Sequence, residues 1–360
     1  MLIIDAHLDL AWNALQWNRN LMNSAYTLRT QEVRTTGKGR AQNTVALPEM
    51  RRARIAVSIV TLLARSTGKL IPNLDYGSPE QAFASAYGQL AYYRALEQAG
   101  QARILRTAAD LSAHVAQWEA WEVNSLDGMT VPPPPLGFVI SMEGADPILH
   151  PAQVDQWHAD GLRLIGLSHY GTGRYAGGTS TEGGLTDLGR ALLIEMEKLG
   201  IILDLTHTSD EAFWEAMERF GGRVIASHQN CRALVPHQRQ FSDAQIRAVI
   251  ERNGVIGAAF DVWMLKPDWH AENTSNAAIT LETVVQHIDH VCQIAGDAQH
   301  AAIGSDLDGG FGRDQSPVDL DTIADLQRIP LLLEKRGYKP EDIAAVMYGN
   351  WRRILEAGLP

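Results

Sequence analysis

Short apolar segments alternate with longer amphipathic segments along most of this 360-residue chain, and this alternation restricts its fold more than any other feature. The short segments are rich in Ile, Val, Leu and Ala, and their length suits strands that are buried on both faces of a parallel sheet. Eight of them predict strands, at 2–6, 55–63, 137–143, 162–169, 201–207, 223–228, 254–260 and 301–306.

The segments between these strands carry the start and stop signals of helices. Each begins with Ser or Thr with an acidic residue close behind, and each stops at Gly. Helices are therefore predicted at 78–100, 186–200, 208–222, 242–254 and 280–296.

Alternating strands and helices predict an α/β fold, and eight strands with helical crossovers predict a (β/α)8 TIM barrel. The alternative is a doubly wound parallel sheet. No predicted strand is followed by the phosphate-binding glycine turn that opens a helix in dinucleotide-binding sheets of that kind. The barrel is therefore favoured.

The whole chain, 1–360, is expected to form one barrel domain, because barrels of this fold routinely exceed about 250 residues. The segment "TVPPPPLG" at 130–137 has the composition of a domain linker. It directly precedes a predicted strand, which favours at least as well a stiff, extended lead into that strand. Unusually long connections predict loop insertions at the C-terminal face of the barrel, at about 10–54, 64–77, 171–185 and 262–279.

The composition argues against several classes of partner. The formal net charge is −11, and an acidic protein repels the phosphate backbone of nucleic acids. No apolar run reaches the ~18 residues that span a bilayer, and the first residues lack the pattern of a signal peptide. Two cysteines, Cys231 and Cys292, cannot build a disulfide framework. We therefore expect a cytoplasmic protein that binds neither nucleic acid nor membranes.

Ionisable side chains stand at or just beyond the ends of six of the predicted strands. In a TIM barrel, the C-terminal ends of the strands surround the active site. Seven side chains should therefore converge on one pocket, namely His7, Asp9, Glu143, His169, His207, His228 and Asp306.

This set of side chains has the chemistry of a metal site. His7 and Asp9 are two positions apart, so both point to the same side of a strand and can bind one ion. Imidazole and carboxylate ligands suit zinc and similar divalent metals. A single His at a strand end is more often a hydrogen-bonded structural residue, but so large a set at strand ends is not expected by chance. The set exceeds what one tetrahedral zinc needs, so it predicts two ions that share a carboxylate.

Other polar motifs give weaker signals. His287, Asp289, His290 and Cys292 resemble a metal cluster, but they lie within a predicted outer helix and are interpreted as its solvated face. The glycine-rich segment 171–178 lacks the spacing of a phosphate loop and is interpreted as part of a flexible lid over the site.

Three more residues are left with open or minor roles. Asp5 either supports His7 from behind or lies on the outer face of its strand, and the pattern favours neither. His237 and His270 stand in predicted loops, where they could line the mouth of the pocket.

Seven motifs resemble the membrane dipeptidase (renal dipeptidase) family of the amidohydrolase superfamily. They occur in the order of that family, span nearly the whole chain, and are highly specific when taken together. The motifs are DAHLDL (5–10), SMEGAD (141–146), LSHYG (167–171), LDLTH (203–207), ASHQNCRAL (226–234), HQRQFSD (237–243) and IGSDLDGG (303–310).

The resemblance implies a TIM barrel of the metal-dependent hydrolase type with two Zn²⁺ ions, other divalent metals being the alternative. His7 and Asp9 would hold one zinc ion. His207 and His228 would hold the other, and Glu143 would bridge the two.

The resemblance also implies roles for three residues that are not metal ligands. His169 would bind the substrate and polarise the scissile carbonyl, Asp306 would carry the proton, and Arg239 would pair with the substrate carboxylate. It further implies a homodimer.

We therefore hypothesise a binuclear zinc dipeptidase that hydrolyses small dipeptides with a free C-terminal carboxylate. Substrates with a D residue at the C-terminal position are included in this hypothesis. One alternative is an amidohydrolase that acts on another small amide, such as an N-acyl amino acid. A second alternative is a metal-binding protein without catalytic activity, which an incomplete ligand set would favour.

Overall fold

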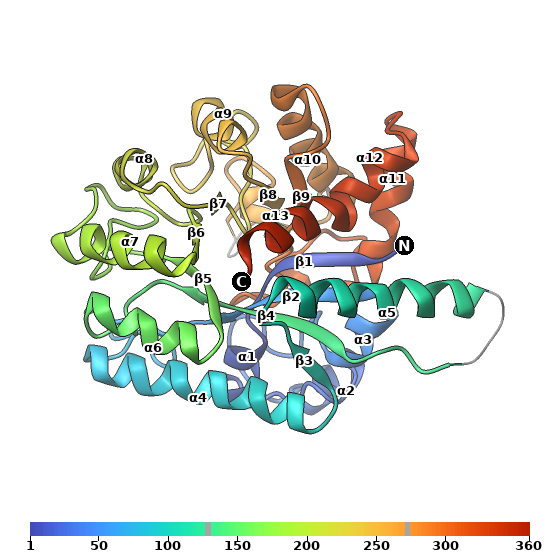
Figure 1. Cartoon of the computed structure of the whole chain (residues 1–360). Helices are drawn as coiled ribbons and strands as arrows, with labels where there is room; N and C mark the ends of the chain where they lie inside the picture. Colours follow the sequence, from blue (N-terminus) through green and yellow to red (C-terminus); the bar gives the residue numbers. More distant parts are fainter. Residues whose placement is uncertain (127–130, 271–273) are drawn as a thin grey trace.

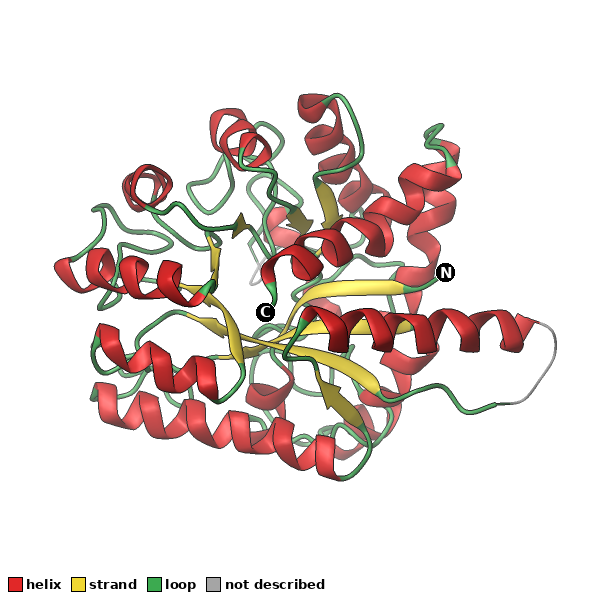
Figure 2. Ribbon diagram, in the orientation of Figure 1, coloured by secondary structure: helices red, strands yellow, loops and turns green. Residues whose placement is uncertain are grey.

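Parallel strands form a curled sheet at the centre of the molecule, and helices surround it (Figure 1, Figure 2). The structure is a computed structural model that describes residues 1–126, 131–270 and 274–360. Its strands are β1 (Ile3–Leu8), β2 (Ile55–Leu62), β3 (Ala102–Ile104), β4 (Leu136–Glu143), β5 (Leu162–Gly166), β6 (Ile202–Asp204), β7 (Val224–Ile225), β8 (Ile256–Ala258) and β9 (Ala301–Ile303).

The predicted strands follow one another around the sheet in chain order. Six of them pair in parallel in the order β1-β2-β4-β5-β6-β7, and β8 pairs with β9. Backbone hydrogen bonds connect these two groups of strands. Gly257 N donates to Ala226 O at 2.8 Å, and Asp306 N donates to His7 O at 3.2 Å. The fold is therefore the curled α/β barrel type that the sequence predicts.

Strand β3 was not predicted. It pairs with the first residues of β4, Ala102 beside Leu136, and it stands outside the path of the other strands. With only three residues and Arg103 at its centre, it lacks the apolar run by which the other strands were recognised.

The predicted helices are all present, with slightly shorter bounds. Helices α7 and α10 end at Gly200 and Gly296, which adopt φ values of 68° and 80°, where glycine is favoured. Side chains of Ser or Thr cap the N-termini of α4, α7, α8 and α9. The five are α4 (Pro79–Gln98), α7 (Asp187–Leu199), α8 (Asp210–Arg219), α9 (Asp243–Glu251) and α10 (Leu281–Ala295).

In the part of the chain that the structure describes, eight further α-helices lie in segments for which the sequence predicted none. Three of them occupy the connection 10–54, which was predicted as a loop insertion. Among the described residues, no helix has both the length and the apolar character that crossing a membrane requires. The eight are α1 (Leu10–Gln16), α2 (Ala25–Gln31), α3 (Leu47–Arg52), α5 (Ala108–Leu126), α6 (Val154–Ala159), α11 (Ile329–Lys335), α12 (Pro340–Ala344) and α13 (Asn350–Gly358).

The other predicted insertions remain largely without regular structure. Segment 64–77 turns back on itself through backbone bonds between Arg65 and Leu74 (2.8 Å) and between Tyr76 and Arg65 (2.8 Å). Residues 271–273 of segment 262–279 lie outside the described residues. So does Thr130, the first residue of the proline-rich segment 130–137.

Candidate metal centre

Four imidazoles surround the carboxylate of Glu143 at the end of β4. The Nε2 atoms of His207 and His228 each lie 3.4 Å from Glu143 Oε1, and those of His7 and His169 lie at 3.5 and 3.7 Å. These residues come from the ends of β1, β4, β5, β6 and β7, so the curl of the sheet brings them together. The predicted convergence at the strand ends is therefore present in the structure.

Two more carboxylates stand beside His7. Its Nε2 atom lies 4.0 Å from Asp9 Oδ1 and 3.9 Å from Asp306 Oδ1. The ligand atoms of these three residues lie within 4.8 Å of one another, as do those of two further groups that share Glu143. The donor atoms are therefore spaced closely enough for two ions that share one carboxylate. The side chains of His7 and Asp9 are almost fully buried, whereas that of Asp306 is 15% exposed.

His207 and His228 face each other in a geometry that suits one ion. Their Nε2 atoms are 3.1 Å apart. Two nitrogen ligands of a tetrahedral zinc ion, each at 2.0–2.1 Å, are separated by about 3.3 Å. Burial holds the pKa of both imidazoles well below its ordinary value, with the charge of Arg239 acting on His207 and that of His7 on His228. Both are thus neutral, which is the form that binds metals.

Hydroxyl groups orient both of these imidazoles from behind. Thr179 Oγ1 lies 2.8 Å from His207 Nδ1 and donates to the carbonyl oxygen of His207 at 3.4 Å, so it can accept the Nδ1 proton. Ser227 Oγ lies 2.9 Å from His228 Nδ1 and 3.4 Å from His7 Nδ1. A proton on Nδ1 leaves Nε2 free to bind an ion, and such outer partners fix the orientation of the ring.

The contribution of Thr179 was missed by the sequence analysis. Thr179 directly follows the glycine-rich segment 171–178 and lies within the predicted insertion 171–185. In the structure, backbone hydrogen bonds connect this part of the chain to the end of β5: Thr179 N donates to His169 O at 2.9 Å, and Gly171 N donates to Thr179 O at 3.0 Å. A side chain at Gly178 would overlap the carbonyl oxygen of His169. The two glycines before Thr179 were therefore the sequence signal that the backbone packs closely against the site at this point.

Thr179→Val is expected to lower metal affinity about 10- to 100-fold, because it removes the hydroxyl that orients His207 while keeping the side-chain shape. Titration of the metal-free variant with Zn²⁺ in the presence of a chelating indicator measures the change. Thr283→Val, at a half-exposed helical position, is the matched control. An affinity equal to that of the wild type would show that Thr179 does not support the site.

Two buried aspartates hold the strand ends at the correct separation. Asp5 accepts hydrogen bonds from the backbone of Ser305 (2.8 Å) and of His7 (3.2 Å). In the same way, Asp204 on β6 accepts from the backbone of Ser227 at 3.0 Å. Asp5 therefore supports His7, the first of its two interpretations, but it does so through the backbone rather than through the imidazole.

Burial leaves two carboxyl groups of the site, Asp9 and Asp306, with incompletely compensated charge. It raises the pKa of Asp9 to about 7, and the charge of Glu143 adds to this effect. Burial also raises the pKa of Asp306 well above its ordinary value, although His7 opposes the shift. Burial would raise the pKa of Glu143 as well, but His7 and His169 hold it well below its usual range. Divalent cations would stabilise such a concentration of buried carboxylates.

A cavity of about 390 Å³ opens onto this cluster. Asp9, Glu143, His169, Asp306 and the buried guanidinium of Arg239 are among the residues that line it. Its size is at the lower end of the range for small-molecule sites. The predicted metal ligands and the three predicted substrate or catalytic residues thus share one site.

Comparison with known proteins places the chain in a family. The family model described as membrane dipeptidase (peptidase family M19) matches residues 1–358. The chain belongs to the membrane dipeptidase family. This confirms the resemblance found in the sequence and classifies the chain among the M19 metallo-dipeptidases.

This membrane dipeptidase family member is similar to individual proteins in sequence and to solved structures in fold. An uncharacterized protein in the pqqA 5' region of Klebsiella pneumoniae is 31% identical over 208 residues, covering 56% of this chain and 73% of its own. A dipeptidase AC of family M19 has a TM-score of 0.78 at 24% identity, covering 100% of this chain and 99% of its own. A Rhodobacter sphaeroides metallo peptidase has a TM-score of 0.75 at 23% identity, covering 99% of both chains. The matches span about half the length of several curated dipeptidases.

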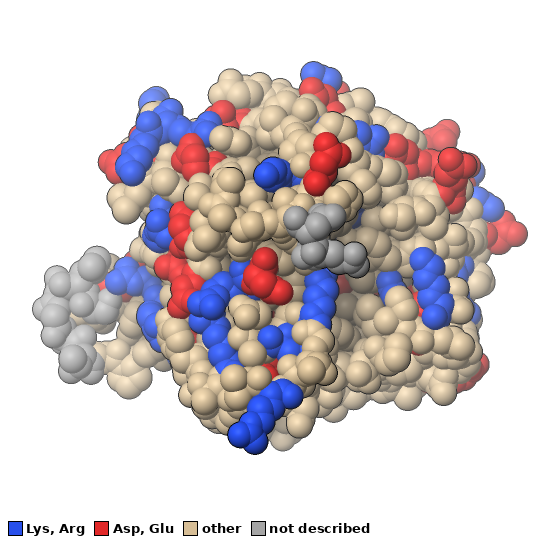
Figure 3. Space-filling model, turned by 180° about the vertical axis from the view of Figure 1, so that it is seen from behind, with Lys and Arg blue, Asp and Glu red and all other residues tan. Residues whose placement is uncertain are grey.

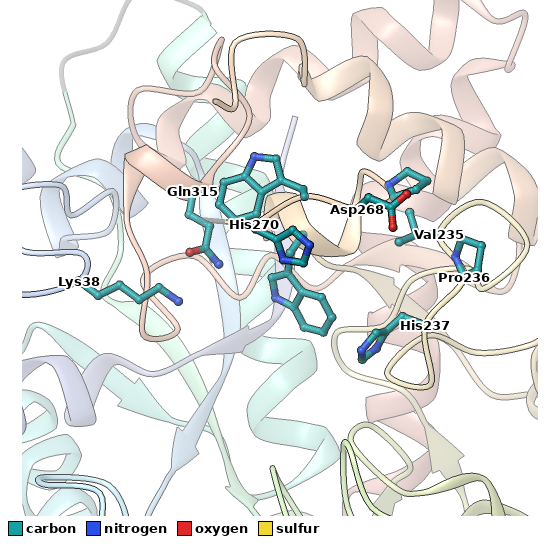
Figure 4. A pocket seen from close by; sticks show the side chains of 10 residues that line it. Lys38, Val235, Pro236, His237, Asp268, His270 and Gln315 are labelled. Atoms are coloured by element: carbon teal, nitrogen blue, oxygen red, sulfur yellow. The ribbon is translucent and has the colours of Figure 1, made fainter. Parts of the chain in front are cut away.

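A larger cavity of about 670 Å³ lies beside the site and shares Lys38 and Trp263 with it. Figure 4 shows Lys38 reaching toward this cavity from one side, with Pro236 and His237 on the other. His237 also packs against Trp263, with ring centroids 5.0 Å apart. His237 and His270 therefore line a cavity at the mouth, as the sequence suggested.

The interpretation of His287 as part of a solvated helix face was wrong. It is buried, and its Nδ1 atom accepts a hydrogen bond from the backbone of Cys231 at 3.1 Å. Cys292 is buried as well, while Asp289 and His290 form ion pairs with other residues. Helix α10 turns one polar residue inward because a backbone N–H of the neighbouring loop needs an acceptor there.

Proposed function

We propose that this membrane dipeptidase family member is a binuclear zinc dipeptidase that cleaves dipeptides with a free C-terminal carboxylate. One observation carries the proposal: four imidazoles surround Glu143 at the bottom of a cavity that also holds the buried cation Arg239. A metal-activated hydrolase requires the first feature, and recognition of a terminal carboxylate requires the second.

The donor atoms fit divalent cations. His7 Nε2 is buried and has no hydrogen-bond partner among the described residues, although it faces three carboxylates. We assign His7 and Asp9 to one zinc ion, His207 and His228 to the other, and Glu143 to both. Bound there, two divalent cations would lower the pKa of a water molecule toward neutrality and polarise the substrate carbonyl.

His169 is suited to donate a hydrogen bond to the scissile carbonyl oxygen. Its Nδ1 atom lies 3.4 Å from Nη1 of Arg65, and a guanidinium can only donate. Nδ1 is therefore the acceptor, and the proton of the neutral ring stands on Nε2, which lies 3.7 Å from Glu143 Oε1. Burial, together with the charges of Arg65 and Arg239, lowers the pKa of His169 to about 3 and keeps the ring neutral. A fixed donor of this kind stabilises developing negative charge on the oxygen.

Asp306 is suited to move the proton from the attacking water to the leaving amine. It borders the cavity beside His7, and its backbone has a φ value of 56°, which is uncommon for a residue other than glycine. A side chain at Gly309 would overlap the Asp306 carboxylate, so that glycine leaves room for it. A carboxylate positioned next to the metal ligands can act as a general base and then as a general acid.

Arg239 is suited to bind the C-terminal carboxylate. It is held by hydrogen bonds to Gln229 Oε1 at 2.5 Å and to the carbonyl oxygen of His228 at 2.9 Å. Its Nε atom is buried and has no partner among the described residues. A guanidinium with donors to spare can pair with a carboxylate.

Arg239→Ala is expected to lower kcat/KM for a dipeptide about 10- to 100-fold, because charge-assisted hydrogen bonds to the terminal carboxylate are lost. Metal content should remain at the wild-type level. Steady-state kinetics of the metal-loaded variant measure the effect, with Arg247→Ala, an exposed arginine, as control. The role of Arg239 would be wrong if the wild type cleaved a dipeptide amide as well as the free acid.

Rates of hydrolysis of two substrate classes distinguish the dipeptidase proposal from the alternative, an amidohydrolase that acts on N-acyl amino acids. Dipeptides with an L or a D residue at the C-terminal position are assayed beside N-acyl amino acids of the same side chains. The Rhodobacter sphaeroides relative was crystallised with a phosphinate mimic of L-Ala-D-Ala, which motivates the D-residue arm. Faster cleavage of N-acyl amino acids would favour the alternative. Three expectations stay predictions, namely that the metal is zinc, that the protein is a homodimer and that it is cytoplasmic. Metal analysis, sedimentation and localisation of the native protein test them in this order.

A further inference from the structure

We propose that Arg65 is a second anion-binding group of the cavity and that it selects dipeptides with an acidic side chain. The inference rests on the proposed function, in which Arg239 takes the terminal carboxylate. It adds a substrate class: dipeptides that carry two carboxylates. Arg65 follows β2, was not singled out in the sequence, and lines the same cavity as the metal centre.

The guanidinium of Arg65 is buried but poorly satisfied. Its side chain is only 3% exposed. With the described residues, its side chain makes two long hydrogen bonds, both from Nη1 at 3.4 Å, to His169 Nδ1 and to the carbonyl oxygen of Tyr170. Its Nε atom has no partner among the described residues. Since a guanidinium has five N–H donors, most of this buried cation's hydrogen-bonding capacity is unused.

The carboxylate nearest to Arg65 does not use that capacity either. Asp75 Oδ2 lies 3.7 Å from Arg65 Nε, which is too long for a hydrogen bond. Both oxygens of Asp75 instead accept hydrogen bonds from Thr67. Asp75 therefore balances the charge of Arg65 without occupying its donors. By contrast, the buried arginine Arg19 pairs directly with Glu32 at 2.8 and 3.0 Å.

The position of Arg65 separates it from Arg239. Arg65 comes from the β2 side of the sheet and Arg239 from the loop beyond β7. The charges of both arginines lower the pKa of His169, which follows β5. Lys69, an exposed cation on the same connection as Arg65, also lines the cavity. Basic side chains gather in the lower half of the face seen in Figure 3.

A carboxylate is the ligand that best suits Arg65. Its planar fork of donors matches two carboxylate oxygens, and water-excluding surroundings strengthen such a pair. With one carboxylate of the dipeptide on Arg239, the second must come from an Asp or Glu side chain. The cavity would therefore favour dianionic dipeptides over neutral ones of the same shape.

The test compares acidic dipeptides with their neutral isosteres. Ala-Glu is paired with Ala-Gln, and Asp-Ala with Asn-Ala, each with an L and a D residue at the C-terminal position. The wild type should prefer the acidic member of at least one pair by about tenfold or more in kcat/KM. In Arg65→Met this ratio should fall to near one, and in Lys335→Met, at an exposed distant site, it should remain that of the wild type.

Arg65→Met leaves Asp75 buried without its balancing charge, so it could fail to fold. The double variant Arg65→Met/Asp75→Asn removes both charges and keeps the test available. A role of Arg65 limited to positioning His169 would slow both members of a pair equally and leave the ratio unchanged. Ratios near one in the wild type, or a ratio that survives in the double variant, would overturn the proposal.

Failure of the proposed function is distinguishable from failure of this inference. If the metal-loaded protein cleaves none of the peptides, the dipeptidase proposal fails, and calorimetric titration with the same pairs decides about Arg65. Tighter binding of the acidic member by about tenfold, lost in the double variant, would support the anion site. Equal binding of both members would overturn it.

Discussion

Glu143→Gln is expected to lower kcat/KM by about 10³-fold or more and to remove at least one metal equivalent per chain. Four imidazoles lie within 3.7 Å of this one carboxylate, so the proposed assignment makes it the ligand common to both halves of the centre. The amide has nearly the same volume but no charge to compensate two cations. Metal analysis after dialysis and steady-state kinetics measure the two effects.

The exposed Glu211→Gln is the matched control and should retain metal and activity. Circular dichroism distinguishes loss of metal from loss of fold. Two metal equivalents in a folded Glu143→Gln protein would contradict the bridging role. Full activity with one equivalent would contradict the need for two ions.

Asp306→Asn is expected to lower kcat about 10²- to 10⁴-fold while both metals remain bound. The amide cannot accept the proton of the attacking water, but His7, Asp9, Glu143 and the histidine pair would still hold the ions. Kinetics and metal analysis on the same preparation check both parts.

Asp314→Asn, an exposed carboxylate on the following turn, is the control for this change. Wild-type kcat in Asp306→Asn would exclude Asp306 as the proton carrier. Loss of a metal equivalent would instead make Asp306 a ligand, in line with its position 3.9 Å from His7 Nε2.

Much of the fold and of the candidate site could be predicted because both depend on local pattern. Apolar runs and helix start and stop signals revealed eight of the strands and five of the helices. Short helices such as α1 and α2 escaped, since they have little apolar periodicity and are stabilised by tertiary contacts. In α1, Ala11 N donates to the hydroxyl group of Tyr93 at 3.0 Å, and in α2, Ala25 N donates to Glu49 Oε2 at 3.0 Å. His287 was assigned to the wrong environment because a helix pattern does not reveal which loop will pack against it.

The order of residues along the chain was enough to predict that the ionisable strand ends meet, because the C-terminal ends of parallel strands lie at one face in any barrel. What orients those side chains depends on how the folded chain packs. Thr179 reaches His207 across a folded loop, Asp5 joins β1 to Ser305, and Arg65 meets His169 from another strand. Each of these contacts joins residues at least 28 positions apart, and long-range hydrogen bonds leave no periodic trace in the chain.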